Sequence, residues 1–239
     1  MTGAPRILPC GDCAISVDFG NVIDVDVNDR VRRLDVALAG AGVPGLVETV
    51  PTYRALMVHF NPLTTDYEAL CRIILDLAAQ TGGGGEARRR WRVPVVYGGD
   101  FGIDLEDMAA FSGLSVPDFI EAHAAPVYTV MMIGFLPGFS YLGGLDPQLQ
   151  RPRRDVPRLK VPASSISIGG AQTAIGSIEC PSGWHLIGRT PAIPFLRGRD
   201  PVFLFDAGDE ICLRPMAISD WDRLAARAAE GDAVVERIA

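Results

Sequence analysis

The periodicity of apolar residues changes near Tyr97, and this change constrains the fold more than any other feature of the sequence. Before it, segments with the two-residue alternation of strands follow segments with the spacing of amphipathic helices. After it, helical spacing nearly disappears, and short β-prone runs are separated by glycine and proline. A chain of 239 residues, 48% of them hydrophobic, can bury the cores of two small domains. We therefore predict two domains, residues 1–97 and 98–239.

The first of these predicted domains is a small α+β domain. Strand and helix patterns follow in the order β-α-β-β-α-β, which is typical of the ferredoxin-like arrangement of two helices on one face of an antiparallel sheet. The glycines at 82–85 lack the Gly-Lys-Ser/Thr of a phosphate loop, and we interpret them as a flexible connection. The predicted elements are strands at 13–19, 46–50, 54–60 and 90–97 and helices at 27–41 and 67–78.

The rest of the chain predicts a closed or nearly closed β-barrel, because repeated short strands punctuated by glycine and proline are typical of that architecture. Two short helices are expected before the barrel, at 105–111 and 115–122, and a last helix fits 220–229. The fold class predicted for the whole chain is therefore α+β. The β-prone runs are 127–133, 166–168, 173–175, 202–205 and 211–214.

The charge balance excludes some classes of partner. A formal net charge of -7 and a pI near 5.0 argue against binding to nucleic acid or to an anionic membrane surface. No positively charged stretch precedes an apolar run at the N-terminus, and no segment is long enough to span a bilayer. We expect a cytoplasmic protein that acts on small molecules or on other proteins.

The five cysteines are scattered along the chain, so a disulfide framework is not expected. Cys10 and Cys13 form a C-x-x-C pair, but no second pair completes the four ligands of a zinc site. Residues three apart on a strand also point to opposite faces. We interpret both as ordinary buried thiols, with redox or metal chemistry as the alternative.

A basic segment stands out in this acidic chain. Between Arg151 and Lys160, five basic residues face one acid, Asp155, and three prolines from Pro152 to Pro162 stiffen the segment. The guanidinium groups of arginines in a stiff segment are partly preorganised to donate paired hydrogen bonds to a carboxylate or a phosphate. A solvated basic loop is the alternative interpretation. The basic residues are Arg151, Arg153, Arg154, Arg158 and Lys160.

Two further segments combine residue types that favour ligand binding. Residues 134–144 carry four glycines with three aromatic rings, and residues 184–191 bring an indole, an imidazole and a guanidinium together. Glycine lets the backbone approach a ligand, and aromatic rings supply an apolar wall. A barrel corner whose rings fill the core would explain the same pattern. The side chains concerned are Phe135, Phe139, Tyr141, Trp184, His185 and Arg189.

The three histidines give two candidates for proton transfer. His59 falls in a predicted strand of the first domain, where a structural role is expected. His123, just before the predicted strand at 127–133, and His185, within the segment 184–191, are the candidates. A hydrogen-bonded packing role is the alternative for each. The sequence shows no metal-ligand spacing and no Ser-His-Asp or Cys-His pattern.

Long motifs in these segments resemble one known family. They are VYTVMMIGFLPGFSYLGGLDP, RPRRDVPRLKVPASS, GGAQT and GWHLIGRTP, with CGDCAISVDFG and VPTYRALMVHFNP nearer the N-terminus. Together they resemble the 5-oxoprolinase B subunit family, which includes KipI, an inhibitor of a sensor histidine kinase, and proteins called allophanate hydrolase subunit 1. The resemblance covers nearly the whole chain and implies a cyclophilin-like barrel after a small α+β domain.

The resemblance also implies a reaction and partners. It implies an ATP-dependent hydrolysis of 5-oxoproline to glutamate by a heteromeric enzyme, whose other chains are the homologous, KipA-like C subunit with its own barrel and the A subunit. The ATP would be bound with or by one of these partners. Two alternatives stay open: a KipI-like inhibitor of a histidine kinase, and half of a biotin-dependent carboxyltransferase of the urea amidolyase type. In the latter, biotin would come from another chain, because no methionine precedes Lys160.

Within this resemblance, each candidate residue receives an expected role. Arginines would bind anionic groups, an amide would orient the substrate amide, an imidazole would move a proton, and two aromatic rings would form a wall. Ser164 departs from the family, which usually has glycine at that position. The expected catalytic residues are His123, Gln172 and Arg158, and the expected substrate-binding residues are Tyr141, Arg153, Trp184 and Arg189.

Overall fold

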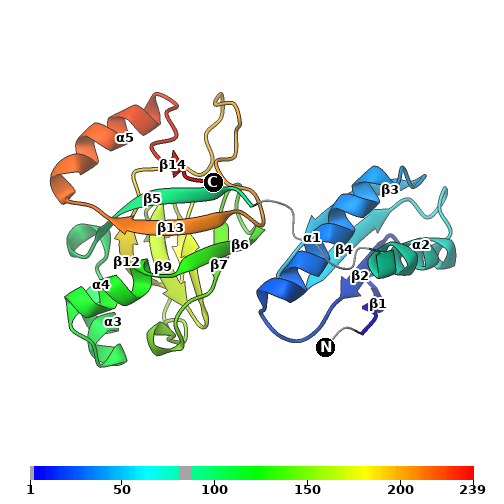
Figure 1. Cartoon of the computed structure of the whole chain (residues 1–239), viewed down its shortest axis with the longest axis horizontal. Helices are drawn as coiled ribbons and strands as arrows, with labels where there is room; N and C mark the ends of the chain where they lie inside the picture. The colour runs from blue at the N-terminus through cyan, green and yellow to red at the C-terminus, as the bar shows by residue number, and fades with distance from the viewer. Residues whose placement is uncertain (1–2, 81–87) are drawn as a thin grey trace. The chain divides into compact units, whose positions relative to one another are not determined.

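The computed structural model describes residues 3–80 and 88–239, and the chain divides by its internal contacts into two compact units, Met1–Ala87 and Arg88–Ala239. Figure 1 shows a helix-and-sheet unit and a barrel unit, as expected for the predicted α+β class. The predicted connection at 82–85 lies outside the described residues. None of the helices in the described part of the chain is long and apolar enough to cross a membrane.

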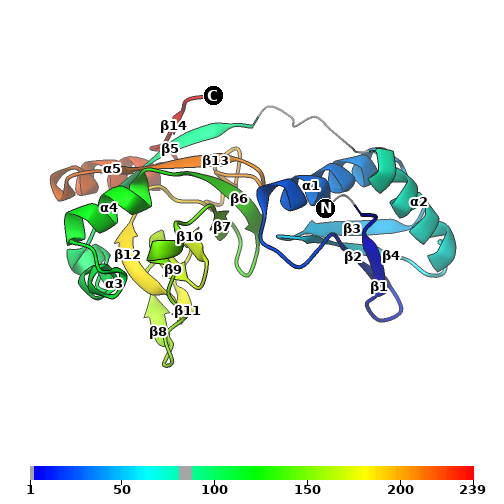
Figure 2. The same ribbon diagram turned by 60° about the horizontal axis from the view of Figure 1, so that its bottom comes forward.

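The first unit is a four-stranded antiparallel sheet with two helices on one face. Its strands run in the order β1-β2-β4-β3, and Figure 2 shows α1 and α2 on the same side of the sheet. The side chain of Asp24 caps α1 by accepting hydrogen bonds from the backbone N–H groups of Asp26 and Val27. The elements are β1 (Arg6–Pro9), β2 (Ala14–Asp18), α1 (Val25–Gly40), β3 (Leu46–Pro51), β4 (Ala55–Phe60) and α2 (Tyr67–Gln80).

The core of this unit follows from the two periodicities of its sequence. Every second residue of β4 is buried, and the apolar stripes of both helices cover that face of the sheet. The buried residues are Ile15, Val17, Val31, Leu34, Leu38, Leu56, Val58, Phe60, Leu70 and Ile74.

One strand belongs to a different sheet from the one predicted. The strand β5 (Arg90–Tyr97) forms as expected, but it pairs with β13 and β12 in the second unit. Its assignment to the first domain was wrong, because local alternation reveals a strand but not its partner. The fourth strand of the first sheet is β1, a short edge strand ending in Pro9 that the sequence pattern did not indicate.

The second unit is a closed barrel. Its strands follow the order β12-β9-β10-β7-β6-β13-β5, and pairing of β5 with β12 closes the ring. The strand β14 (Glu236–Arg237) pairs antiparallel with β5 outside the closed ring. The strands β8 (Arg158–Val161) and β11 (Cys180–Ser182) form a separate two-stranded arm. The other barrel strands are β6 (Val127–Ile133), β7 (Ser140–Gly143), β9 (Ser165–Gly169), β10 (Gln172–Ile175), β12 (His185–Arg189) and β13 (Glu210–Pro215).

Three helices pack on the barrel, at positions close to those predicted. They are α3 (Leu105–Ser112), α4 (Val116–Ala124) and α5 (Trp221–Ala229). Ser115 caps α4 by accepting from the N–H of Asp118, as its spacing from that residue indicates. The run predicted as a strand at 202–205 forms an isolated bridge between Phe203 and Phe195 instead.

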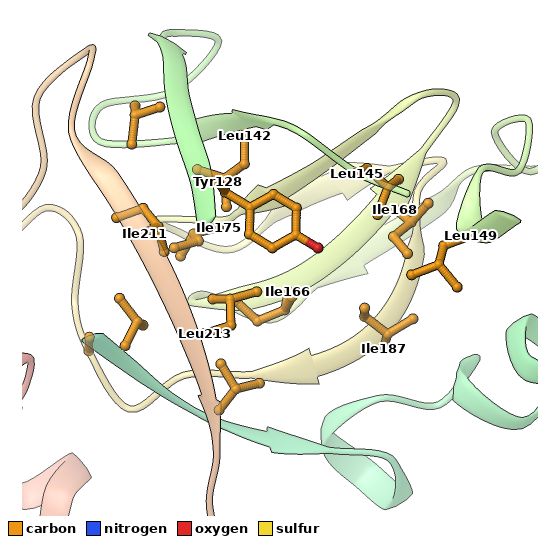
Figure 3. Packing of buried hydrophobic residues seen from close by; sticks show 14 of the residues in the cluster. Tyr128, Leu142, Leu145, Leu149, Ile166, Ile168, Ile175, Ile187, Ile211 and Leu213 are labelled. Atoms are coloured by element: carbon orange, nitrogen blue, oxygen red, sulfur yellow. The ribbon is translucent and has the colours of Figure 1, made fainter. Parts of the chain in front are cut away.

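Aliphatic side chains fill the barrel, and Figure 3 shows them converging on the ring of Tyr128. They come from strands on every side of the ring, so the barrel is a packed core. Among the fully buried residues are Val93, Val95, Tyr128, Val130, Leu142, Ile166, Ile168, Ile175, Ile187 and Ile211.

Candidate functional site

Strand register divides the barrel wall into an inner and an outer set of side chains. Ile166 and Ile168 of β9 lie in the core, so the alternating residues Ser165, Ser167 and Gly169 face outward. Residues paired directly across neighbouring strands share a face. This pairing places Tyr141, Gln172, Ala174, Leu186 and Arg189 on the outer side.

Three aromatic rings cluster on this outer side. The ring of Tyr141 lies 4.7 Å from that of Phe139 and 5.8 Å from that of Trp184, between centroids. The guanidinium of Arg153 lies over the Trp184 ring, 5.6 Å from its centroid. We call Phe139, Tyr141, Trp184 and Arg153 the aromatic face. The structure thus brings together three of the predicted site residues: Tyr141, Arg153 and Trp184.

A glycine allows the indole to lie on the strand. A Cβ added at Gly169 would be 2.5 Å from the Cδ2 atom of Trp184, so any side chain there would displace the ring. Gln172 is the cross-strand partner of Gly169 and is half-buried at the start of β10. The predicted Gln172 therefore also lies beside the aromatic face.

The phenol of Tyr141 stays protonated at neutral pH. Burial raises its pKa above the ordinary value, although the nearby charge of Arg153 acts in the opposite direction. The face therefore combines an apolar wall, a phenol that can donate a hydrogen bond, and an exposed guanidinium. This combination suits a small ring that carries a carboxylate.

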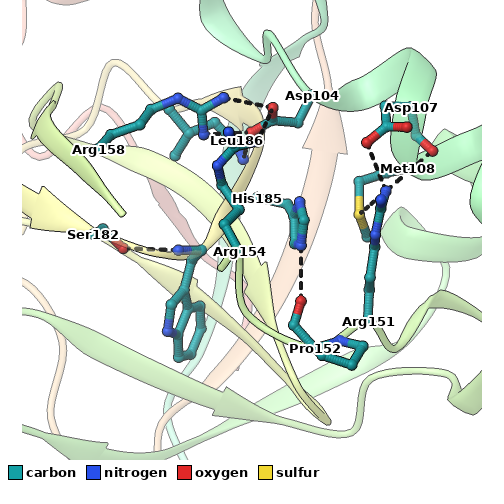
Figure 4. A network of polar contacts seen from close by, with 11 residues as sticks. Asp104, Asp107, Met108, Arg151, Pro152, Arg154, Arg158, Ser182, His185 and Leu186 are labelled. Atoms are coloured by element: carbon teal, nitrogen blue, oxygen red, sulfur yellow. Dashed lines mark hydrogen bonds and ion pairs between the residues drawn. The ribbon is translucent and has the colours of Figure 1, made fainter. Parts of the chain in front are cut away.

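Arg158, in contrast, is fully engaged by a carboxylate. Its two terminal nitrogens donate to the oxygens of Asp104 at 2.8 and 2.6 Å, as Figure 4 shows. Arg154 lies 3.5 Å from the same carboxylate, and the backbone N–H of Leu186 donates to it at 2.7 Å. The geometry does not fit the predicted role of Arg158 as an anion binder in catalysis. It gives this arginine a structural role, linking the arm to α3 and β12.

The Asp104 carboxylate is held ionised. Burial alone would raise its pKa, but hydrogen bonds from Arg158 and from the N–H of Leu186, with the charges of Arg158 and Arg154, lower it below the ordinary value. Asp104 lies just before α3, and its sequence position gives no sign of an arginine partner. Its side chain makes no capping hydrogen bond and accepts hydrogen bonds from Arg158 and Arg154 instead.

We predict that Asp104→Asn lowers the free energy of unfolding by about 3 kcal/mol, because it leaves Arg158 without its buried partner. Asp107→Asn is the matched control, since Asp107 pairs with Arg151 but is largely exposed, and should cost less than about 1 kcal/mol. Urea denaturation measures both changes.

The pH dependence gives a second measurement on the same variant. Because the pKa of Asp104 is lowered in the folded state, its contribution is complete above the unfolded pKa of about 4 and is lost as pH falls below it. The gap between wild type and Asp104→Asn should thus shrink in acid. A gap of equal size at all pH values would contradict the ion pair.

His123 lies inside the barrel, fully buried, and not at the aromatic face. The hydroxyl of Thr173 donates to the carbonyl of Ser167 at 3.1 Å, so it accepts from Nε2–H of His123 at 3.0 Å. Nδ1 then accepts from the hydroxyl of Tyr97 at 2.9 Å. Burial lowers the pKa of His123 to about 3. The predicted proton-transfer role does not fit this neutral, closed environment.

We predict that wild type loses about 2 kcal/mol of stability between about pH 6.5 and about pH 5 through His123 alone, because only the unfolded state takes up the proton. His123→Gln should lack this component, so its unfolding free energy should fall less over that range. Chemical denaturation of both proteins at several pH values compares the slopes. Parallel slopes would show that His123 is not held neutral in the fold.

The polar groups of His185 and Arg189 make their contacts away from the aromatic face. Nε2–H of His185 donates to the carbonyl of Pro152 at 2.9 Å, which anchors the basic segment to β12. Arg189, at the other end of β12 from Trp184, donates from Nε to the carbonyl of Ala163 at 3.2 Å. The predicted substrate-binding set is therefore divided between two places on the barrel.

The surroundings of Arg189 are aromatic. Its guanidinium lies over the rings of Phe101 and Trp221, 5.9 and 5.1 Å from their centroids, and burial lowers its pKa. In the described part of the chain, no carboxylate forms an ion pair with it. The nearby Ser164 adopts a left-handed conformation with φ of 61°, which explains why relatives would favour glycine there.

The described residues contain no cluster of three or more His, Cys, Asp and Glu side chains that could hold a metal ion. The sequence did not indicate Asp104, Phe101 or Trp221, because each contacts an arginine that is distant in the chain. Asp104 pairs with Arg158, and Phe101 and Trp221 pack against Arg189. Of the predicted site residues, Tyr141, Arg153, Gln172 and Trp184 share the aromatic face or its edge, whereas Arg158, His123 and Arg189 lie elsewhere.

Comparisons with known proteins agree with this fold. A family model described as carboxyltransferase domain, subdomain C and D, matches residues 5–205. A protein from Bacillus subtilis, named as the B subunit of 5-oxoprolinase, is 34% identical over 220 residues, 87% of this chain and 92% of that protein. A Haemophilus influenzae protein of the same name is 41% identical over 166 residues, 70% of this chain and 78% of that protein.

Among solved structures, the urea amidolyase of Kluyveromyces lactis matches 98% of this chain with a TM-score of 0.80 and 17% identity. This chain spans 16% of the length of that protein. At this level of identity the likeness concerns the fold alone, and it includes both the small sheet unit and the barrel.

Proposed function

The chain belongs to the family of the carboxyltransferase domain, subdomains C and D, and from this membership we propose that it is the B subunit of a heteromeric ATP-dependent 5-oxoprolinase. The enzyme would hydrolyse 5-oxoproline to glutamate. The observation that carries the proposal is the match, over most of the chain, to two proteins that bear the name of this B subunit.

The aromatic face offers the groups that such a substrate needs. 5-Oxoproline is a five-membered lactam with one carboxylate. In the proposed complex its carboxylate pairs with Arg153, and its ring lies against Tyr141 and Trp184. Gln172, at the edge of the face, hydrogen-bonds the lactam amide. Arg158 and His123 support the fold in this proposal and do not contact the substrate.

The reaction requires activation of an unreactive amide. Transfer of the γ-phosphoryl group of ATP to the lactam oxygen releases ADP and makes the ring carbon open to water. Addition of water to that carbon and cleavage of the ring C–N bond, with a proton taken up by nitrogen, give an acyl phosphate. A second water molecule hydrolyses the acyl phosphate to glutamate and phosphate. Nearby cations would stabilise the phosphoryl charge.

We assign the nucleotide to one of the partner chains. The chain has a single lysine, Lys160, whose side chain is 79% exposed and pairs with Glu179 at 3.3 Å. It follows no glycine-rich turn of the kind that cradles phosphates. Two further subunits, one of them a homologous barrel, would complete the enzyme, and the partner would close the open side of the aromatic face.

A biotin-dependent carboxyltransferase is the second candidate, favoured by the description of the matching family. Leu159 precedes Lys160, so this lysine lacks the methionine of a biotin attachment site, and biotin would arrive on another chain. Copurification with a biotinylated protein would support this candidate. Copurification with a histidine kinase, without a barrel partner, would support a regulator instead.

The proposal is tested by coexpressing the chain with its partner subunits and measuring ATP hydrolysis that depends on 5-oxoproline. Arg153→Ala should raise KM for 5-oxoproline about tenfold or more, because a charged hydrogen bond is worth about 1.5–3 kcal/mol. Arg197→Ala, at another exposed arginine, is the control. An intact assembly without 5-oxoproline-dependent hydrolysis would overturn the function, and an unchanged KM in Arg153→Ala would overturn the site.

A further inference from the structure

The C-x-x-C pair lies at the tip of a hairpin, and both thiols are exposed. Cys10 and Cys13 connect β1 to β2, whereas Cys180 is buried and Cys71 and Cys212 are half-buried. The sequence interpretation of Cys10 and Cys13 as buried thiols was therefore wrong. Both residues lie in the turn between β1 and β2, outside any buried strand.

The turn brings the two cysteines to the same end of the hairpin. Gly11 and Asp12 form the turn, with Gly11 at φ of 67°, a left-handed conformation that glycine adopts without strain. The N–H of Cys10 donates to the carbonyl of Ala14 at 2.9 Å and closes the hairpin. The N–H of Phe60 donates to the carbonyl of Cys13 at 2.9 Å and fixes the other side.

Turn geometry sets the separation of the two residues. The first and fourth residues of a β-turn have Cα atoms less than about 7 Å apart. Disulfides join Cα atoms about 4.4–6.8 Å apart. Residues three apart on a strand face opposite ways, but the first and fourth residues of a turn can face each other.

We propose that Cys10 and Cys13 form a reversible intramolecular disulfide by exchange with a low-molecular-weight disulfide such as oxidised glutathione. One thiolate attacks a glutathione sulfur, forms a mixed disulfide and releases one glutathione thiolate. The second thiolate then attacks the cysteine sulfur, forms the Cys10–Cys13 bond and releases the other glutathione. The protein loses two electrons and two protons, and oxidised glutathione is reduced to two thiols.

The small size of the ring makes this bond reversible. A disulfide that closes a four-residue loop gains little from restricting the unfolded chain, so its stability is low compared with that of a structural disulfide. Because both cysteines are exposed, a reductant has access to the bond. Gly11 has no atom within 4 Å of the position of a Cβ, which leaves the turn room to adjust when the bond forms.

The disulfide would restrain the hairpin tip, which forms one wall of a cavity in the first unit. Pro9, Gly11 and Asp12 of the hairpin tip line a cavity of about 470 Å³ opposite Phe60, Pro62 and Tyr67. Closing the turn restrains that wall, and this surface belongs to the first unit and does not include the aromatic face. The inference therefore stands independently of the proposed enzyme function.

The test is oxidation of the full chain with oxidised glutathione, followed by peptide mass mapping. We expect a Cys10–Cys13 peptide lighter by two hydrogen atoms, and its return to the dithiol form with dithiothreitol. Cys10→Ser should retain a glutathione adduct on Cys13, because no second thiol can displace it. Cys71→Ser, at a half-buried thiol, should behave as wild type.

A second variant tests the geometry itself. Insertion of one alanine after Asp12 lengthens the turn and should slow ring closure about tenfold or more, with glutathione adducts accumulating on both cysteines. Circular dichroism checks that the unit remains folded. Wild-type protein that collects separate glutathione adducts on Cys10 and Cys13, or whose two thiols do not react at all, would overturn the proposal.

Discussion

One buried carboxylate, that of Asp104, joins the arm to β12 in the barrel unit. Asp104 receives both terminal nitrogens of Arg158 and the backbone N–H of Leu186, so it ties together segments that are 54 and 82 residues away in the chain. Arg158 begins the arm, and Leu186 lies two residues after Trp184. A charge removed from water must be paired and hydrogen-bonded, and this arrangement satisfies that requirement. The ion pair thus connects the arm to β12, the strand that follows the indole in the chain.

The same principle explains how the arginines divide their roles. The sequence shows a group of like charges in an acidic chain, which indicates anion binding in general terms. The structure commits Arg158 to Asp104 and Arg151 to Asp107, and leaves the guanidinium of Arg153 on the aromatic face. Arg189 lies over the rings of Phe101 and Trp221 at the far end of its strand. Whether each of these arginines can bind a ligand depends on contacts with residues that are distant in the sequence, and the sequence alone does not show those contacts.

Local patterns predicted the elements more reliably than their partners. The helices α1 and α2 follow directly from their apolar spacing, and β5 forms over the residues expected. The sheet that β5 joins could not be predicted, because its partner β13 lies more than a hundred residues later and alternation carries no information on pairing. The short edge strand β1 was not predicted, because its four residues are too few to show a clear alternation.

The candidate site was predicted to a similar extent. Tyr141 and Trp184 were recognised from the company of glycines and aromatic rings, and both lie on the aromatic face. His123 was a candidate because histidine titrates near neutral pH, but burial inside the barrel removes that property, and no local signal reveals burial. Asp104 was not predicted as a site residue, because its partner Arg158 lies 54 residues later in β8 and only the folded barrel brings the two together.

The most direct test of the proposed site is a crystal structure of the assembled enzyme with 5-oxoproline bound. The proposal predicts ligand density on the aromatic face, with the carboxylate at Arg153 and the ring against Tyr141 and Trp184. Density at another place on the barrel, or only on a partner chain, would contradict it.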